Sequence, residues 1–116
     1  MTDLQRIELM VKTLDGKKGL DIQVFKIDEL SIVADYFVLV NGTSSTHVKT
    51  LADEVEYELE KAGVKTDHIQ GRATGWIVLD YDSIIVHVFD KQNRDFYKLE
   101  RLWTDATSVD ISGYLK

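Results

Sequence analysis

The chain has 116 residues, with 14 Lys and Arg against 20 Asp and Glu, and it contains neither cysteine nor proline. This length suits one domain with one hydrophobic core. The lack of cysteine excludes a disulfide framework, a thiolate nucleophile and zinc held by sulfur. A net charge of −6 argues against general binding to nucleic-acid phosphates, so we expect no nucleic acid as a direct, sequence-specific partner. With neither a secretory signal nor the roughly 18 apolar residues that a membrane span needs, we expect a cytoplasmic protein without a membrane partner.

The first half of the chain predicts a helix, two strands and a second helix. Residues 2–5 have the form of a capping box, and apolar residues at helical spacing follow over residues 4–14. Alternation over residues 20–25 predicts a strand. The continuous apolar run of residues 36–40 is typical of a central strand buried on both faces. Residues 48–62 return to helical spacing, with a serine before them as the expected cap.

The second half predicts three more strands and a third helix. Residues 64–69 form a weak strand, which would complete a right-handed crossover if it pairs parallel to the central strand. Residues 76–79 and 84–89 flank a short polar segment and predict an antiparallel hairpin, in which Asp82 accepts a left-handed conformation. Aromatic and leucine residues at helical spacing over residues 96–103 predict the third helix.

The predicted order αββαβββα indicates a single α/β domain, with a mixed five-stranded sheet and helices mainly on one face. We expect this domain to span residues 1–105 and the polar residues 106–116 to form a C-terminal tail. Trp76, Val78 and Asp80 share one face of their strand, and the residues between them are also apolar. Because three helices cannot cover both faces, we expect open apolar surface of the kind found at protein interfaces. The alternative places the tryptophan in the core.

Candidate enzyme sites in the sequence are incomplete. Residues 42–45 stand between a strand and a helix, where free amides can bind phosphate, but a phosphate loop would add a Lys and further glycines. The only Asp-x-Asp lies in the hairpin turn at residues 80–82, away from the strand where a nucleotidyltransferase holds metal ions. The histidines lack a short metal-ligand spacing, and we expect His87 to hydrogen-bond to a carboxylate. We therefore expect no catalytic residue, no metal and no cofactor.

Four segments, taken together and in order, resemble the ribosomal silencing factor family, also called Iojap. They read DYFVLVNGTSSTHV (35–48), GWIVLDY (75–81), VHVF (86–89) and RDFYKLERLW (94–103). The resemblance spans roughly residues 4–105 and implies a small domain similar to the nucleotidyltransferase fold, without the metal carboxylates of that superfamily. Two positions depart from the usual pattern, with Gln70 in place of Glu and Asp82-Ser83 in place of Gly-Asp.

The resemblance also implies a function that is not enzymatic. Members bind the large ribosomal subunit through a basic ribosomal protein on its intersubunit face, the fourteenth of the large-subunit series. They block joining of the small subunit and so lower translation when nutrients are short, and organellar members act in large-subunit maturation. An acidic chain suits a basic protein target.

Roles for individual residues follow from the resemblance. Arg94 would either form an internal ion pair with Glu100 or Asp35 or contact the partner. In the partner-binding set, a tryptophan is the desolvated anchor, a valine and a tyrosine extend the apolar contact, and three aspartates pair with Lys or Arg. This set is Trp76, Val78, Tyr81, Asp80, Asp82 and Asp90.

Two alternatives stay open on the residues alone. One is a nucleotide-binding or nucleotidyltransferase-type enzyme that uses residues 42–45, which would require nucleotide affinity dependent on Mg²⁺. The other is a homodimeric interaction module whose open sheet face serves self-association.

Overall fold

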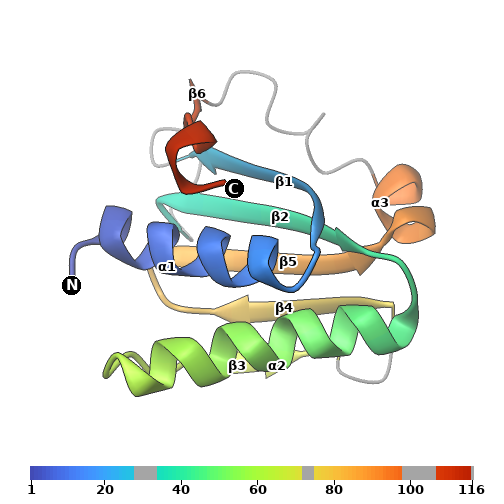
Figure 1. Cartoon of the computed structure of the whole chain (residues 1–116), viewed down its shortest axis with the longest axis horizontal. Coiled ribbons are helices and arrows are strands. Elements are labelled where there is room, and N and C mark those ends of the chain that lie inside the picture. The colour runs from blue at the N-terminus through green and yellow to red at the C-terminus, as the bar shows by residue number, and fades with distance from the viewer. Residues whose placement is uncertain (28–33, 72–74, 98–106, 116) are drawn as a thin grey trace.

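A mixed sheet of six strands, in the order β3-β4-β5-β2-β1-β6, forms the centre of the molecule (Figure 1). The structure is a computed structural model that describes residues 1–27, 34–71, 75–97 and 107–115. Along the chain the elements are α1 (Asp3–Gly16), β1 (Leu20–Lys26), β2 (Tyr36–Gly42), α2 (Ser45–Lys61), β3 (His68–Gln70), β4 (Trp76–Asp80), β5 (Ile84–Asp90), α3 (Lys91–Tyr97), β6 (Thr107–Ser108) and the 3₁₀ turn η1 (Ser112–Tyr114).

Both long helices begin at the residues that their caps predict. The Thr2 hydroxyl accepts from the Gln5 amide at 3.2 Å, and the Gln5 side chain accepts from the Thr2 amide at 2.8 Å, which completes the capping box of α1. The Ser44 hydroxyl accepts from the His47 amide at 3.1 Å and caps α2. Each cap satisfies an amide that the first turn leaves free, so the two helix starts are confirmed.

The centre of the sheet is the strand that the apolar run predicts. β2 lies between β1, which it pairs with antiparallel, and β5, which it pairs with in parallel. β4 and β5 form the predicted antiparallel hairpin, and Asp82 in its turn has φ 68°. Residues 64–69 do not complete the crossover that a parallel pairing would form, because β3 pairs antiparallel with β4 at the sheet edge. The strand of three residues takes the edge, and the longer apolar β5 takes the buried place beside β2.

The prediction of five strands is wrong, because the C-terminal segment adds a sixth strand to the sheet. Thr107 and Ser108 pair antiparallel with Lys26 and Phe25 and form the sixth strand. Ile111 follows with 8% of its surface exposed and joins the hydrophobic core. A strand of two polar residues has no periodicity of its own, so it exists only through its pairing with β1. The predicted third helix overlaps α3, and its residues 98–103 lie outside the described residues.

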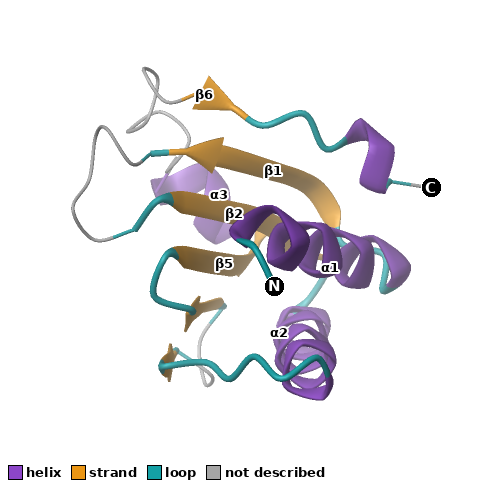
Figure 2. Ribbon diagram, turned by 90° about the vertical axis from the view of Figure 1, so that its left-hand side faces the viewer, coloured by secondary structure: helices purple, strands orange, loops and turns teal. Residues whose placement is uncertain are grey.

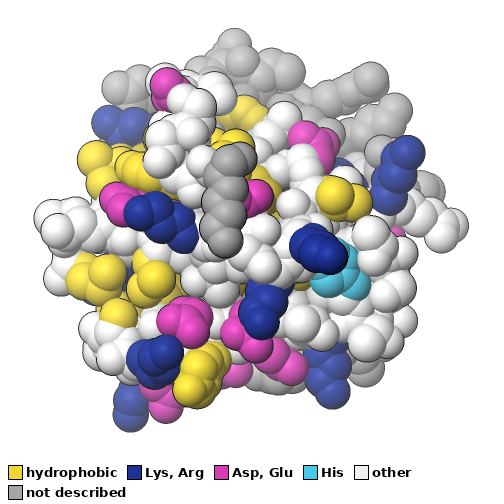
Figure 3. Space-filling view, viewed as in Figure 1, with side chains coloured by type: hydrophobic (Ala, Val, Ile, Leu, Met, Phe, Trp, Pro, Cys, Tyr) yellow, Lys and Arg dark blue, Asp and Glu magenta, His cyan; other side chains and the backbone are white. Residues whose placement is uncertain are grey.

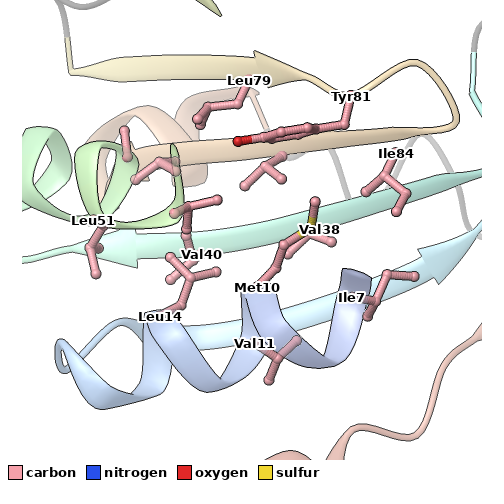
Figure 4. Packing of buried hydrophobic residues seen from close by; sticks show 14 of the residues in the cluster. Ile7, Met10, Val11, Leu14, Val38, Val40, Leu51, Leu79, Tyr81 and Ile84 are labelled. Atoms are coloured by element: carbon pink, nitrogen blue, oxygen red, sulfur yellow. The ribbon is translucent and has the colours of Figure 1, made fainter. Parts of the chain in front are cut away.

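The hydrophobic core lies between the sheet and the pair α1 and α2, which cover one face of the sheet (Figure 2). Figure 4 shows side chains of α1 and α2 meeting those of β2 and β4. These side chains are fully or almost fully buried. They include Ile7, Met10, Val11, Leu14, Val38, Val40, Leu51, Leu79, Tyr81 and Ile84. Helical spacing on one side and strand alternation on the other bring these residues to a single layer.

The outer surface of these helices carries charges of both signs and some hydrophobic side chains (Figure 3), among them the exposed Leu4 on α1 and Tyr57 on α2. Within the described ranges, no helix has the length and apolar character that crossing a bilayer requires. α3 contacts β2 and β5 from the opposite side of the sheet (Figure 2). Helices therefore cover mainly one face, as the order of elements predicts.

Candidate protein-interaction surface

The sheet face opposite α1 and α2, called here the second face, carries alternate residues of β2, β4 and β5. Residues paired across neighbouring strands point to the same face. The hairpin register sets Trp76 opposite Phe89 and Val78 opposite His87, and Asp80 follows on the same side. Trp76, Val78 and Asp80 are each partly exposed. The structure thus brings together three of the six residues expected to bind a partner.

Four rings from three strands form an aromatic cluster on the second face: Phe37, Trp76, His87 and Phe89. Trp76 stacks on Phe89 with ring centroids 5.7 Å apart, and Phe37 meets His87 edge to face at 4.8 Å. The Trp76 indole N–H donates to His87 Nδ1 at 3.2 Å. Trp76 lies outside the core that α1 and α2 cover. It is instead the partly exposed member of a second, smaller packed group.

His87 differs from its expected role. Its Nδ1 accepts from an indole N–H, where a carboxylate partner was expected. The ring is 8% exposed, and this burial lowers the pKa of His87 to about 4, because desolvation disfavours the charged form. The imidazole is therefore neutral near pH 7, with its proton on Nε2, since Nδ1 is the acceptor. His87 Nε2 has no hydrogen-bond partner among the described residues.

The neighbours of Trp76 cannot be recognised from the sequence alone. Phe37, His87 and Phe89 each fit a strand pattern, and no single motif marks them as a group. The hairpin register was the available signal, because it places Phe89 directly opposite Trp76. Phe37 joins only through the parallel pairing of β2 with β5, which connects residues far apart in the chain. Strand order decides that contact, and the sequence did not reveal it.

Two of the expected aspartates have structural partners in the chain itself. Asp80 Oδ1 accepts from the Asp82 amide at 2.8 Å and holds the hairpin turn, with Asp82 exposed at its tip. Asp90 Oδ1 accepts from the amide and the side chain of Asn93, at 2.8 and 3.0 Å, at the start of α3. A Cβ at Gly75 would overlap Asp90, so the two chain segments pass very close there. Only Asp80 lies on the same face as Trp76, between the turn and the aromatic cluster.

Tyr81 does not lie on the surface, which corrects the prediction that it extends the partner contact. Its side chain is 2% exposed and belongs to the core beneath α1 and α2 (Figure 4). It follows Asp80, so strand alternation turns it to the opposite face. Burial and the nearby Glu56 and Glu60 raise the pKa of the Tyr81 phenol. Its hydroxyl has no hydrogen-bond partner in the part of the chain that the structure describes.

Removing that hydroxyl should not weaken the fold. For Tyr81→Phe, we expect the free energy of unfolding to stay unchanged or to rise by up to about 1 kcal/mol, because an unsatisfied buried hydroxyl costs desolvation without return. Urea denaturation of the variant beside the wild type measures this change. A loss of more than about 1 kcal/mol would show that the hydroxyl has a stabilising partner.

Arg94 connects α3 to β1 and β2. It is 2% exposed and donates to the Asp21 carbonyl at 2.6 Å, to Gln23 Oε1 at 2.7 Å and to Asn41 Oδ1 at 3.0 Å. The Asp21 carboxylate lies 3.6 Å away. Of the two roles left open, the internal one is correct, with Asp21 as the ionic partner in place of Asp35. Glu100 lies outside the described residues.

Residues 42–45 have structural reasons for their composition. A Cβ at Gly42 would lie 2.8 Å from the Val48 amide nitrogen, so the turn from β2 into α2 needs a glycine. The Thr43 amide already donates to His47 Nδ1 at 2.9 Å, which leaves fewer amides for a phosphate. Across residues 1–27, 34–71, 75–97 and 107–115, no group of three or more His, Asp or Glu could hold a metal ion.

Comparison with known proteins agrees with the resemblance. The family model described as "Ribosomal silencing factor during starvation" matches residues 2–116. A ribosomal silencing factor from Haemophilus influenzae is 40% identical over 98 residues, which cover 84% of this chain and 96% of that protein. One from Halalkalibacterium halodurans is 29% identical over 116 residues, with 99% of each chain covered. A crystal structure of a protein from Chromobacterium violaceum superimposes with a TM-score of 0.87 at 30% identity, covering 90% of this chain and 88% of the other.

Relatives also occur in organelles. A mouse protein named mitochondrial assembly of ribosomal large subunit protein 1 is 28% identical over 102 residues, which cover 84% of this chain and 45% of that protein. The match of the family model includes the C-terminal segment that adds β6 to the sheet. A family model that covers residues 2–116, with a relative of 40% identity, shows that this chain belongs to the ribosomal silencing factor family of translation regulators.

Proposed function

We propose that this protein binds the large ribosomal subunit in the cytoplasm through the second face of its sheet and blocks joining of the small subunit. The contact is a basic ribosomal protein on the intersubunit face, the fourteenth of the large-subunit series. Trp76 is the anchor, Val78 extends the apolar contact, and Asp80 pairs with Lys or Arg of the partner. Asp82 and Asp90 lie at the two ends of β4 and β5 and contribute charge at the margin.

The observation that carries the proposal is the partly exposed Trp76, which packs on an aromatic cluster, with the carboxylate of Asp80 at the other end of β4 on the same face. A partly exposed aromatic ring that packs on other rings is typical of the few residues that dominate a protein interface. The net charge of −6 favours encounter with a basic surface. The name of the mouse relative refers to the large subunit, which supports the choice of subunit.

Sedimentation with isolated ribosomal subunits tests the proposal. We expect the purified protein to sediment with the large subunit and not with the small subunit, and to reduce the yield of joined ribosomes when both subunits are mixed. Raising the salt concentration should weaken the association, because part of the attraction is between charges. The proposal is wrong if the protein sediments with neither subunit. Light scattering of the free protein tests the alternative of self-association through the same face, because it distinguishes a monomer from a dimer.

A further inference from the structure

We infer that His87 is a positioning residue for the interaction surface: its Nδ1 accepts the indole N–H of Trp76 and so fixes the orientation in which the tryptophan meets a partner. The partner, and the anchoring role of Trp76, rest on the proposed function. The orientation of the indole is a property of the free chain and can be measured without any partner.

The geometry places the two side chains diagonally on the second face. Trp76 lies opposite Phe89 and His87 opposite Val78, so they occupy neighbouring strands two positions apart. Their rings are 5.9 Å apart at their centroids, and the hydrogen bond between them is 3.2 Å long. Phe89 stacks on the indole with an angle of 28° between the planes. Stacking fixes the plane of the indole, and the hydrogen bond fixes its rotation within that plane.

The histidine is itself held in place. Phe37 contacts the imidazole edge to face at 68°, and the ring is 8% exposed. A buried neutral imidazole offers one acceptor nitrogen and one N–H. Because Nδ1 faces the indole N–H, the proton must be on Nε2. The arrangement therefore specifies one tautomer of His87 as well as one orientation of Trp76.

This arrangement affects binding by organising the surface before the partner arrives. A partly exposed tryptophan whose N–H is satisfied only by water can turn between rotamers, and binding would have to select one of them. The hydrogen bond to His87 makes that selection in the free chain. We expect its loss to weaken binding by about fivefold to tenfold, the range expected for one net hydrogen bond together with the ordering of one side chain.

Nitrogen-15 NMR of the free protein tests the geometry. The variant Trp103→Phe leaves Trp76 as the one indole of the chain, which contains two tryptophans. We expect His87 to be protonated at Nε2 and unprotonated at Nδ1, and the Trp76 indole signal to shift in His87→Leu. A proton on Nδ1, or an indole signal that His87→Leu leaves unchanged, would overturn the inference. If the large subunit does not bind the wild type, the proposed function fails and this measurement still decides the orientation.

A double-mutant cycle tests the effect on binding. His87→Leu and His87→Asn have side chains of nearly the same shape, but only asparagine keeps an acceptor at the same number of bonds from the backbone as Nδ1. We expect His87→Leu to weaken sedimentation with the large subunit by about fivefold to tenfold and His87→Asn to recover most of the loss. In a Trp76→Phe background, which lacks the indole donor, His87→Leu should cause no further loss. The same loss in both backgrounds, or no loss in either, would contradict the positioning role.

Discussion

Replacing Trp76 by alanine is expected to weaken binding to the large ribosomal subunit at least thirtyfold, which corresponds to the loss of roughly 2 kcal/mol or more that is typical of an interface anchor. The side chain is partly exposed and stacks on Phe89, so the variant removes the ring that would be desolvated and also the support between β4 and β5. Sedimentation at several protein concentrations measures the loss.

A matched control is available on the other side of the molecule. Tyr57 lies on α2 and is 58% exposed, so Tyr57→Ala removes a comparable exposed ring from a helix surface. We expect Tyr57→Ala to bind as the wild type does. Circular dichroism and the urea midpoint show whether Trp76→Ala is folded at the temperature used. If a folded Trp76→Ala binds within threefold of the wild type, the anchor lies elsewhere, and the function itself is tested by the subunit experiment.

Replacing Arg94 by methionine is expected to lower the free energy of unfolding by about 3–5 kcal/mol, the range found when one member of a buried charged network is removed. The guanidinium, 2% exposed, donates to Asp21, Gln23 and Asn41. Methionine fills a similar volume without donating, so it leaves the acceptors of a carbonyl and two amides without their donor. The Asp21 backbone has φ 52°, an uncommon conformation for a residue other than glycine, and the bond from Arg94 holds its carbonyl.

Lys91→Met on the same helix is the control, because it makes the same change in charge at an exposed position. We expect it to alter the free energy of unfolding by less than about 0.5 kcal/mol. Urea denaturation of both variants measures their free energies of unfolding. The comparison holds if the free energy depends on urea concentration with the same slope in both variants. If Arg94→Met is as stable as Lys91→Met, the three hydrogen bonds of Arg94 make no net contribution to the free energy of unfolding. Arg94→Lys should lie between them, since one ammonium cannot reach three acceptors in a fork geometry.

The candidate surface shows where inference from the residues succeeds and where it stops. Alternation along residues 76–80 placed Trp76, Val78 and Asp80 on one face, which the structure confirms. The same alternation puts Tyr81 on the opposite face, yet the resemblance assigned it to the partner contact. The structure shows it in the core. A local rule was more informative here than the position of a residue within a motif.

Local patterns also located the helix caps, the hairpin and the central strand, because each depends on neighbouring residues and a period of two or 3.6. The family, too, is recognisable from residue identity alone. Strand order is different, since β5 takes the parallel place beside β2, and the weak strand of residues 64–69 pairs antiparallel with β4 instead. Contacts between segments distant in the chain decide that order. The same is true of β6, which pairs with β1, of Arg94 among acceptors on β1 and β2, and of the hydrogen bond from Trp76 to His87. Hydrogen-bond partners that lie 11 to 73 residues apart leave no periodic trace in either partner's local sequence, so only the folded chain reveals them.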